Sequence, residues 1–236
     1  MTPVDPGSFR VAGLLLAVSL TMTACAGLQT ARMEMPATLA LGEPQTLEGP
    51  IGSAQGELRL GELHGRFQRS ASRLTWFERL AQDRATLSYT LEPDGLRANC
   101  TLQGQSAKAG VLQIPVARMT YLCAYSRGGA PLSHRLELRA VDTSLGTRAE
   151  RRGHLEMDGI SLELHSVHRV QGSPLPLAAP VGYLFHHDGR PVAALDLNDV
   201  RARLWRRHSD APDSALARAV SHAALALALL WDPATN

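Results

Sequence analysis

The sequence predicts a mainly β fold (α+β), in which antiparallel strands form a barrel or strongly curved sheet packed around a hydrophobic C-terminal helix. Alternation of apolar and polar residues, typical of half-buried strands, dominates from residue 57 to about residue 205. Asp-Gly pairs at 158–159 and 188–189 separate alternating runs, as tight hairpins require. A long Ala- and Leu-rich segment follows only near the C-terminus, so the pattern contains no helices between strands to form parallel βαβ units.

The first 25 residues depart from this pattern and are typical of an export signal. A weakly positive start is followed by VAGLLLAVSLTM at 11–22, a run without charge. This run is shorter than the roughly 20 residues of a membrane-spanning helix but suits the apolar core of a signal peptide. It leads into LTMTAC at 20–25, which resembles the lipobox of bacterial lipoproteins. The resemblance implies a cleaved signal peptide at 1–24 and an acylated Cys25; an ordinary secretory signal with an incidental cysteine is the alternative.

Acylation of Cys25 also implies a location. Each buried methylene contributes about 0.8 kcal/mol, and stable anchoring requires more than one acyl chain, which the lipoprotein family supplies. Ala26 follows the cysteine, where the family's inner-membrane retention signal has Asp. The resemblance therefore implies a lipid-anchored protein on the periplasmic face of the outer membrane.

Residues 25–56 are predicted to form a lipidated N-terminus and a flexible tether. Prolines and glycines recur and no period persists, apart from one short strand near the end of the segment. About 30 such residues would reach roughly 30 Å as a flexible coil. The alternative is that part of this segment packs onto the domain. The domain itself is expected at 57–236, as a single β-rich unit.

Four runs show the strand alternation most clearly: 85–91, 96–102, 119–125 and 136–140. Cys100 and Cys123 both lie on the apolar faces of their runs. In an oxidising periplasm they are expected to form a disulfide, with two buried thiols as the alternative. Its loop of about 23 residues would stabilise the fold by about 3 kcal/mol on the chain-entropy model. About ten strands are expected in all.

The Asp158-Gly159 turn fixes a register that brings histidines and a carboxylate together. It pairs His154 with Glu163 and Arg152 with His165. The set His154, Glu163 and His165 is a weak candidate for a divalent metal site, because imidazole and carboxylate groups ligate such ions. The alternative is a solvent-facing surface carrying a His154–Glu163 pair worth about 0.2–1 kcal/mol.

The C-terminal helix is predicted over 211–231, with an acidic N-cap at Asp210. Its only polar stripe is Arg218 and His222, so it should be buried in the core; membrane insertion is the rival interpretation. Antiparallel strands, a closing hairpin GYLFHHDGRPVAALDLND and an apolar C-terminal helix resemble the tubby and LURP-one-like barrels. That resemblance, over about residues 57–232, implies twelve strands closed around a central hydrophobic helix, in a family whose members include phosphoinositide binders and scramblases.

Charge and motifs restrict the chemistry. Lys+Arg 24 against Asp+Glu 22 is too balanced for an electrostatic nucleic-acid binder, and no strong catalytic motif or cofactor-binding loop occurs. One basic cluster, made of Arg201, Arg203, Arg206 and Arg207, could contact an anionic surface such as headgroups or lipopolysaccharide phosphates. The alternative is a solvated strand face, in which case Trp205 within the cluster packs against the helix.

These observations favour a membrane-anchored periplasmic lipoprotein that is not an enzyme. Its expected role is a non-catalytic binding or envelope-assembly module, with no cofactor and no nucleic acid. The expected partners are the membrane, through the lipid, and an envelope protein, a lipid or peptidoglycan. The alternatives are a lipid-binding or transfer module with an internal cavity and a metal-dependent hydrolase built on the His154 face.

Overall fold

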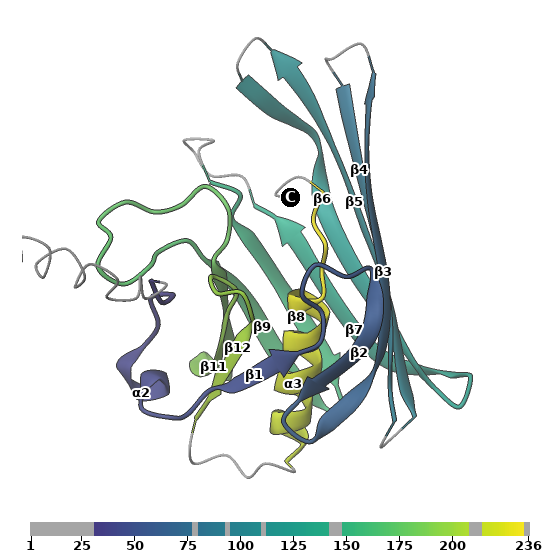
Figure 1. The fold of residues 1–236 in the computed structure, drawn as a ribbon, viewed down its shortest axis with the longest axis vertical. Helices are drawn as coiled ribbons and strands as arrows, with labels where there is room; N and C mark the ends of the chain where they lie inside the picture. The colour runs from purple at the N-terminus through teal and green to yellow at the C-terminus, as the bar shows by residue number, and fades with distance from the viewer. Residues whose placement is uncertain are drawn as a thin grey trace, which may run out of the picture. The chain divides into compact units, whose positions relative to one another are not determined.

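The computed structural model describes residues 31–76, 80–92, 95–109, 112–141, 148–207 and 214–233. Within these residues, twelve antiparallel strands form one closed barrel around a C-terminal helix (Figure 1). This confirms the fold class expected from the alternation and from the apolar C-terminal segment. The signal peptide, the lipobox and Cys25 lie outside the described residues.

The elements follow one another simply along the chain. The helices are α2 (Ala37–Ala40) and α3 (Ala215–Ala228). The strands are β1 (Gln45–Glu48), β2 (Gln55–Leu60), β3 (Leu63–Trp76), β4 (Leu80–Leu91), β5 (Leu96–Ala109), β6 (Leu112–Arg127), β7 (Ala130–Ala140), β8 (Arg151–Met157), β9 (Ile160–Val167), β10 (Gly182–His187), β11 (Arg190–Asp196) and β12 (Arg203–Arg206). Each strand pairs with its chain neighbours, and β1 closes the barrel by pairing with β12.

Helix α3 lies inside the barrel, as Figure 1 shows, and its side chains belong to the main core. Two barrel tyrosines hold it: Tyr89 donates to the carbonyl of His222 at 3.4 Å, and Tyr121 donates to the carbonyl of Ala226 at 2.8 Å. The helix is shorter than predicted because Ser214 caps it by accepting from the Ala217 N–H. The expected cap at Asp210 lies outside the described residues. Among the helices described here, none has the length and apolar character to cross a membrane.

The two ends of the barrel are named here by the helix. The entry end is where α3 begins at Ala215, and the exit end is where Leu229–Pro233 leave it. Strands β3–β6 extend past the other strands at the exit end (Figure 1). In β3 this extension exposes Leu74 and Trp76, whose exposed fractions are 52% and 43%.

Several local predictions are confirmed. The disulfide Cys100–Cys123 is present, and the two cysteines face each other directly across β5 and β6. The hairpin at Asp158-Gly159 has the expected register, with His154 opposite Glu163 and Arg152 opposite His165.

The predicted tether is corrected over its described part. Residues 45–48 form β1 inside the barrel, and Met33 pairs with Val170 on the outer wall. Met33 and Leu39 are fully buried there, in a second cluster with Val170, Val181, Ala194 and Trp205. The apolar side chains of this segment cover the wall, so the chain is bound to the barrel from residue 31.

Trp205 was expected to pack against the C-terminal helix, and this is wrong. Leu204 belongs to the interior cluster, so the alternation of β12 places Trp205 on the outer wall. There it is buried beneath the N-terminal segment with an exposed fraction of 3%. Both residues are apolar, so the sequence did not decide which of them faces the helix.

Candidate functional site

The weak metal candidates lie on the outer wall of the barrel. His154 and Glu163 are exposed, and His165 approaches Glu163 at 3.6 Å. The His165 ring packs on His186 with centroids 4.8 Å apart, and burial, followed by the charge of His165, lowers the pKa of His186. Among the described residues, no group of three or more His, Cys, Asp and Glu side chains is placed to hold a metal ion.

The basic cluster does not form one surface. Arg203 pairs with Asp199 at 3.1 Å and lies over the Trp205 ring at 5.5 Å. Arg207 donates to the carbonyl of Pro191 at 2.7 Å, and Arg206 alternates to the opposite side of β12. Arg201, in the loop before β12, is exposed. Arg201 makes no ion pair among the described residues and is the one of the four arginines that lies in the loop before β12.

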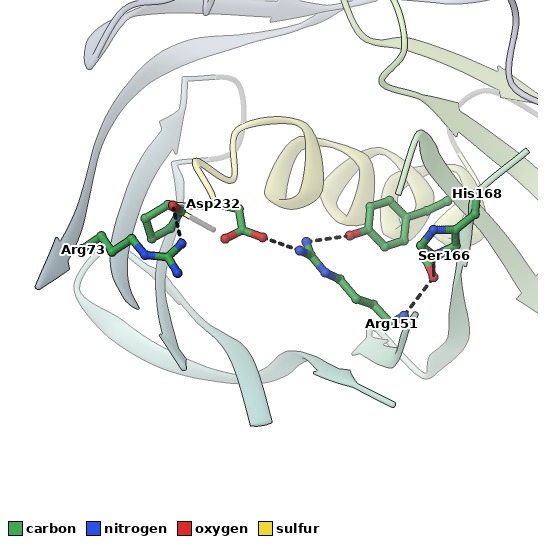
Figure 2. A network of polar contacts seen from close by, with 7 residues as sticks. Arg73, Arg151, Ser166, His168 and Asp232 are labelled. Atoms are coloured by element: carbon green, nitrogen blue, oxygen red, sulfur yellow. Dashed lines mark hydrogen bonds and ion pairs between the residues drawn. The ribbon is translucent and has the colours of Figure 1, made fainter. Parts of the chain in front are cut away.

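At the exit end, arginines from the barrel wall hold the segment that follows α3. Arg151 forms a buried ion pair with Asp232, whose carboxylate faces it in Figure 2. Arg73 donates to the carbonyl of Pro233 at 3.4 Å, and Arg69 lies over the Trp231 ring at 4.9 Å. These contacts fix the end of the chain across the barrel mouth.

The charges of this network are matched to their surroundings. Burial opposes the charge of Arg151, but Tyr183 and Asp232 outweigh it and leave the pKa of Arg151 raised. Burial raises the pKa of Asp83; Arg73, 3.6 Å away, opposes the shift, and nearby Asp232 adds to it. Arg151 is paired with Asp232 and Arg73 with Asp83, so each of these charges has an opposite charge beside it. We interpret the network as one that closes the barrel mouth.

His168 extends the network to a surface loop. The backbone N–H of Arg151 donates to Ser166 Oγ at 2.8 Å, and Ser166 Oγ lies 3.1 Å from His168 Nε2 (Figure 2). His168 Nδ1 is 3.0 Å from the carbonyl of Leu177. A neutral ring that donates from Nδ1 and accepts at Nε2 satisfies both contacts, and burial lowers the pKa of His168 in agreement with that form.

The entry end carries a pocket in which titratable side chains from the strands and the central helix converge. It has a volume of about 500 Å³ and is lined by Leu96, Arg127, His134, Met157, Asp158, Arg218 and His222. These residues come from strands β5–β8, the β8–β9 turn and α3, so the closed barrel and its helix bring together distant parts of the chain. The volume lies within the range of small-molecule sites.

The geometry of this entry pocket centres on His134 and Asp158. His134 Nε2 lies 3.0 Å from Asp158 Oδ1, and Arg218 approaches the other carboxylate oxygen at 3.8 Å. The His134 side chain is 10% exposed, and its buried Nδ1 has no hydrogen-bond partner among the described residues. A buried polar atom left unpaired costs about 1–3 kcal/mol.

Aromatic and cationic groups complete the entry pocket. The Tyr125 ring stands edge-on to His134 and to His222, with centroids 6.3 and 6.2 Å away, and burial raises the pKa of Tyr125. Arg127, Arg218 and the two imidazoles supply N–H donors, against one carboxylate among the described lining residues. Two arginines and two imidazoles in a lining with one described carboxylate suit a ligand that carries an anionic oxygen group.

A larger hollow of about 630 Å³ lies on the outer wall of β2–β5. Its side chains, such as Gln68, Ser88 and Asn99, are the solvent-facing halves of alternating strands. Its charged lining residues Glu57, Arg66 and Arg97 are exposed, so it resembles an ordinary solvated wall more than the entry pocket does.

Sequence reasoning missed most of this site. The helical pattern predicts Arg218 and His222 as the polar stripe of the helix, but no pattern in the sequence singles out His134 or Arg127. The signal that could have found His134 is its place in the alternation of β7, on the same side as the apolar Leu136 and Leu138. Its partner Asp158 was noticed only as a turn residue.

Comparison of the chain with protein-family models, with curated proteins and with solved structures found no match. The resemblance to the tubby and LURP-one-like barrels therefore stays a prediction. Function has to be inferred from this chain's own residues.

Proposed function

We propose that this chain is a lipoprotein of the bacterial cell envelope, anchored through Cys25 on the periplasmic face of the outer membrane, whose barrel is a non-catalytic binding module. The lipobox resemblance of LTMTAC supports the anchor. The entry pocket, where His134, Asp158 and Arg218 converge, supports the binding role. The observation that carries the binding role is the convergence of His134, Asp158 and Arg218 on one pocket at the entry end, with the first two side chains 3.0 Å apart.

The packing of α3 favours binding at the ends or on the outside of the barrel. Leu225 and Leu227 are buried among the interior side chains of the strands. A lipid chain in the same space would have to displace them, at a cost of about 1.5–3 kcal/mol for each leucine brought out of the core. An internal lipid cavity is therefore less well supported than a site at the barrel mouth. Among the described residues, no observation favours the metal-dependent hydrolase.

The anchor is tested by replacing Cys25 with alanine and fractionating cells that produce the full chain. The variant should move from the membrane to the soluble periplasmic fraction, because it has no acyl chains to bury. Intact-mass measurement of the wild-type protein should show the added lipid. Ser19→Ala, a change in the same signal segment, is the control and should remain in the membrane. Retention of Cys25→Ala in membranes would contradict the anchor.

The binding role is tested by crosslinking in intact envelopes, followed by capture of the full chain. A ligand or partner captured by the wild type should be lost from His134→Ala combined with Arg218→Ala. The exposed outer-wall variant Arg152→Ala should capture it as well as the wild type does, and circular dichroism should show all three folded. Equal capture by all three would move the site away from the entry pocket; capture of nothing by the folded wild type would count against a binding module.

A further inference from the structure

Exposed apolar side chains gather in two loops at the exit end. Leu175 is 73% exposed in the loop between β9 and β10, where Leu177 is 45% exposed. Val200 is 75% exposed in the loop between β11 and β12. Large apolar side chains with this exposure in neighbouring loops are typical of a contact surface.

The same two loops hold the start of the described chain. The Glu34 N–H donates to the carbonyl of Arg169 at 2.9 Å, and the Gln171 N–H donates to the carbonyl of Arg32 at 2.8 Å. From the other loop, the Asn198 side chain donates to the carbonyl of Ala31. The chain is therefore fixed beside Leu175 and Val200 from Ala31 onward.

This attachment limits the distance to the lipid anchor. Cys25 is six positions before Ala31 in the sequence. A fully extended chain covers at most about 3.5 Å per residue, so Ala31 lies within about 21 Å of an acylated Cys25. The anchor thus keeps Ala31, and the loops that hold it, within about 21 Å of the bilayer surface.

The charge of this end fits an anionic lipid surface. Arg32, Arg169 and Arg201 are exposed beside the apolar side chains, and none of them makes an ion pair among the described residues. Glu34 is the exposed acid in the same segment. Basic side chains near an anionic leaflet strengthen its binding, on the order of fivefold for each residue.

The loops are also held in place by two buried polar side chains, those of His168 and Asp196. The Leu177 N–H donates to the carbonyl of His168 at 2.7 Å, and the His168 ring binds the carbonyl of Leu177 in return. Asp196, fully buried, accepts from the Met33 N–H at 3.2 Å and from the Asn198 N–H at 2.8 Å. The backbone of the two loops that carry the exposed apolar side chains is therefore fixed by hydrogen bonds.

We propose that these loops form a lipid-facing surface, made of Leu175, Leu177 and Val200 with Arg32, Arg169 and Arg201, which docks the barrel on the bilayer that holds Cys25. This surface rests on the proposed function, because the anchor supplies the proximity. The apolar side chains enter the headgroup layer and the arginines contact anionic headgroups. The barrel is then held in one orientation on the membrane.

The test uses the acylated full chain in vesicles of phosphatidylethanolamine and phosphatidylglycerol, with one cysteine introduced and labelled with an environment-sensitive fluorophore. The labelled variants are Leu175→Cys and Val200→Cys. Leu41→Cys is the matched control, because Leu41 is 89% exposed and precedes Gly42, which lies against the carbonyl of Arg206 at the far end of β12. Cys100 and Cys123 are joined in the core and do not take the label.

Lipids with a quencher near the headgroup should quench the labels at 175 and 200 at least about twofold more than the label at 41. Replacing Arg32, Arg169 and Arg201 with glutamine should reduce that quenching, whereas replacing the outer-wall residues Arg66, Arg84 and Arg97 should not. Equal quenching at all three labels of a protein whose mass shows acylation would overturn the docking surface and leave the lipoprotein proposal intact. An unmodified Cys25 and a soluble protein would overturn the proposed function, and the docking surface with it.

Discussion

Replacing Asp232 with alanine should destabilise the barrel strongly, because the change leaves Arg151 buried without its partner. The two side chains are 8% and 7% exposed. Removing one member of such a pair costs about 3–5 kcal/mol, since the remaining charge stays desolvated. For a chain of this size, each kcal/mol lowers Tm by about 2–4 °C, which corresponds to a fall of about 10 °C. Thermal unfolding followed by circular dichroism measures this shift.

Two further variants separate the buried charge from ordinary side-chain loss. Arg152→Ala removes an exposed arginine that pairs with Glu150 at 3.1 Å, and it should cost less than about 1 kcal/mol. Arg151→Met combined with Asp232→Leu leaves no uncompensated charge and should recover most of the stability lost in Asp232→Ala. If Asp232→Ala and Arg152→Ala shift Tm equally, the ion pair does not hold the chain end at the mouth.

Three further predictions concern other parts of the fold. Replacing both Cys100 and Cys123 with alanine should lower the free energy of unfolding by about 3 kcal/mol in urea titration, because the unfolded chain gains the entropy of the open loop; a loss below 1 kcal/mol would contradict this. Gly182→Ala should greatly reduce the yield of folded protein, because the new Cβ would lie 2.1 Å from the carbonyl oxygen of Leu195, whereas Gly104→Ala, with 3.6 Å to its nearest atom, should leave the yield unchanged. Stability should fall between pH 7.5 and 5.5, because the lowered pKa of His168 lets the unfolded chain bind a proton near pH 6.5 that the folded chain resists. His168→Gln should flatten that dependence, leaving the part due to His186, and an unchanged Tm–pH profile would show that His168 does not contribute.

The strands that could be predicted are those with one face in the core. In β4, Ala85, Leu87, Tyr89 and Leu91 are all buried, as their alternation indicated. A register slip of one residue would bring every one of them to the surface, so the pattern is strong and easily read. The disulfide followed from the same alternation, because it placed both cysteines on the inner face.

Short and irregular segments could not be predicted in this way. β1 has four residues, too few for alternation to be distinguished from chance. Residues 31–44 contain prolines and no period, yet Met33 and Leu39 are fully buried on the wall. Their burial depends on contacts with Ala194 of β11 and Trp205 of β12. The local sequence around residues 31–44 does not predict such distant contacts.

The polar sites depend on contacts between distant parts of the chain. Arg151 and Asp232 are 81 positions apart, and His134 meets Asp158 only because β7 and β8 are neighbours in a closed barrel. The metal candidates were chosen from a register that proved correct, but correct pairing placed them on the solvent-facing wall. Pairing predicts which residues are adjacent, whereas a pocket also requires an element on the far side, which here is α3.

The corrected start of the barrel changes what kind of lipoprotein is expected. A 30-residue coil would let the domain turn freely above the membrane, whereas a chain bound to the wall from Ala31 limits how far the loops that hold Ala31 can lie from the anchor. Ala31 is held by loops at the exit end, and the entry pocket lies at the other end of α3, about 21 Å away for a 14-residue helix. With the loops that hold Ala31 docked on the bilayer, the entry pocket lies at the end of α3 away from them. A ligand for His134 and Arg218 would then arrive from the aqueous side of the envelope, which favours a water-soluble anionic molecule or an envelope protein over a membrane lipid.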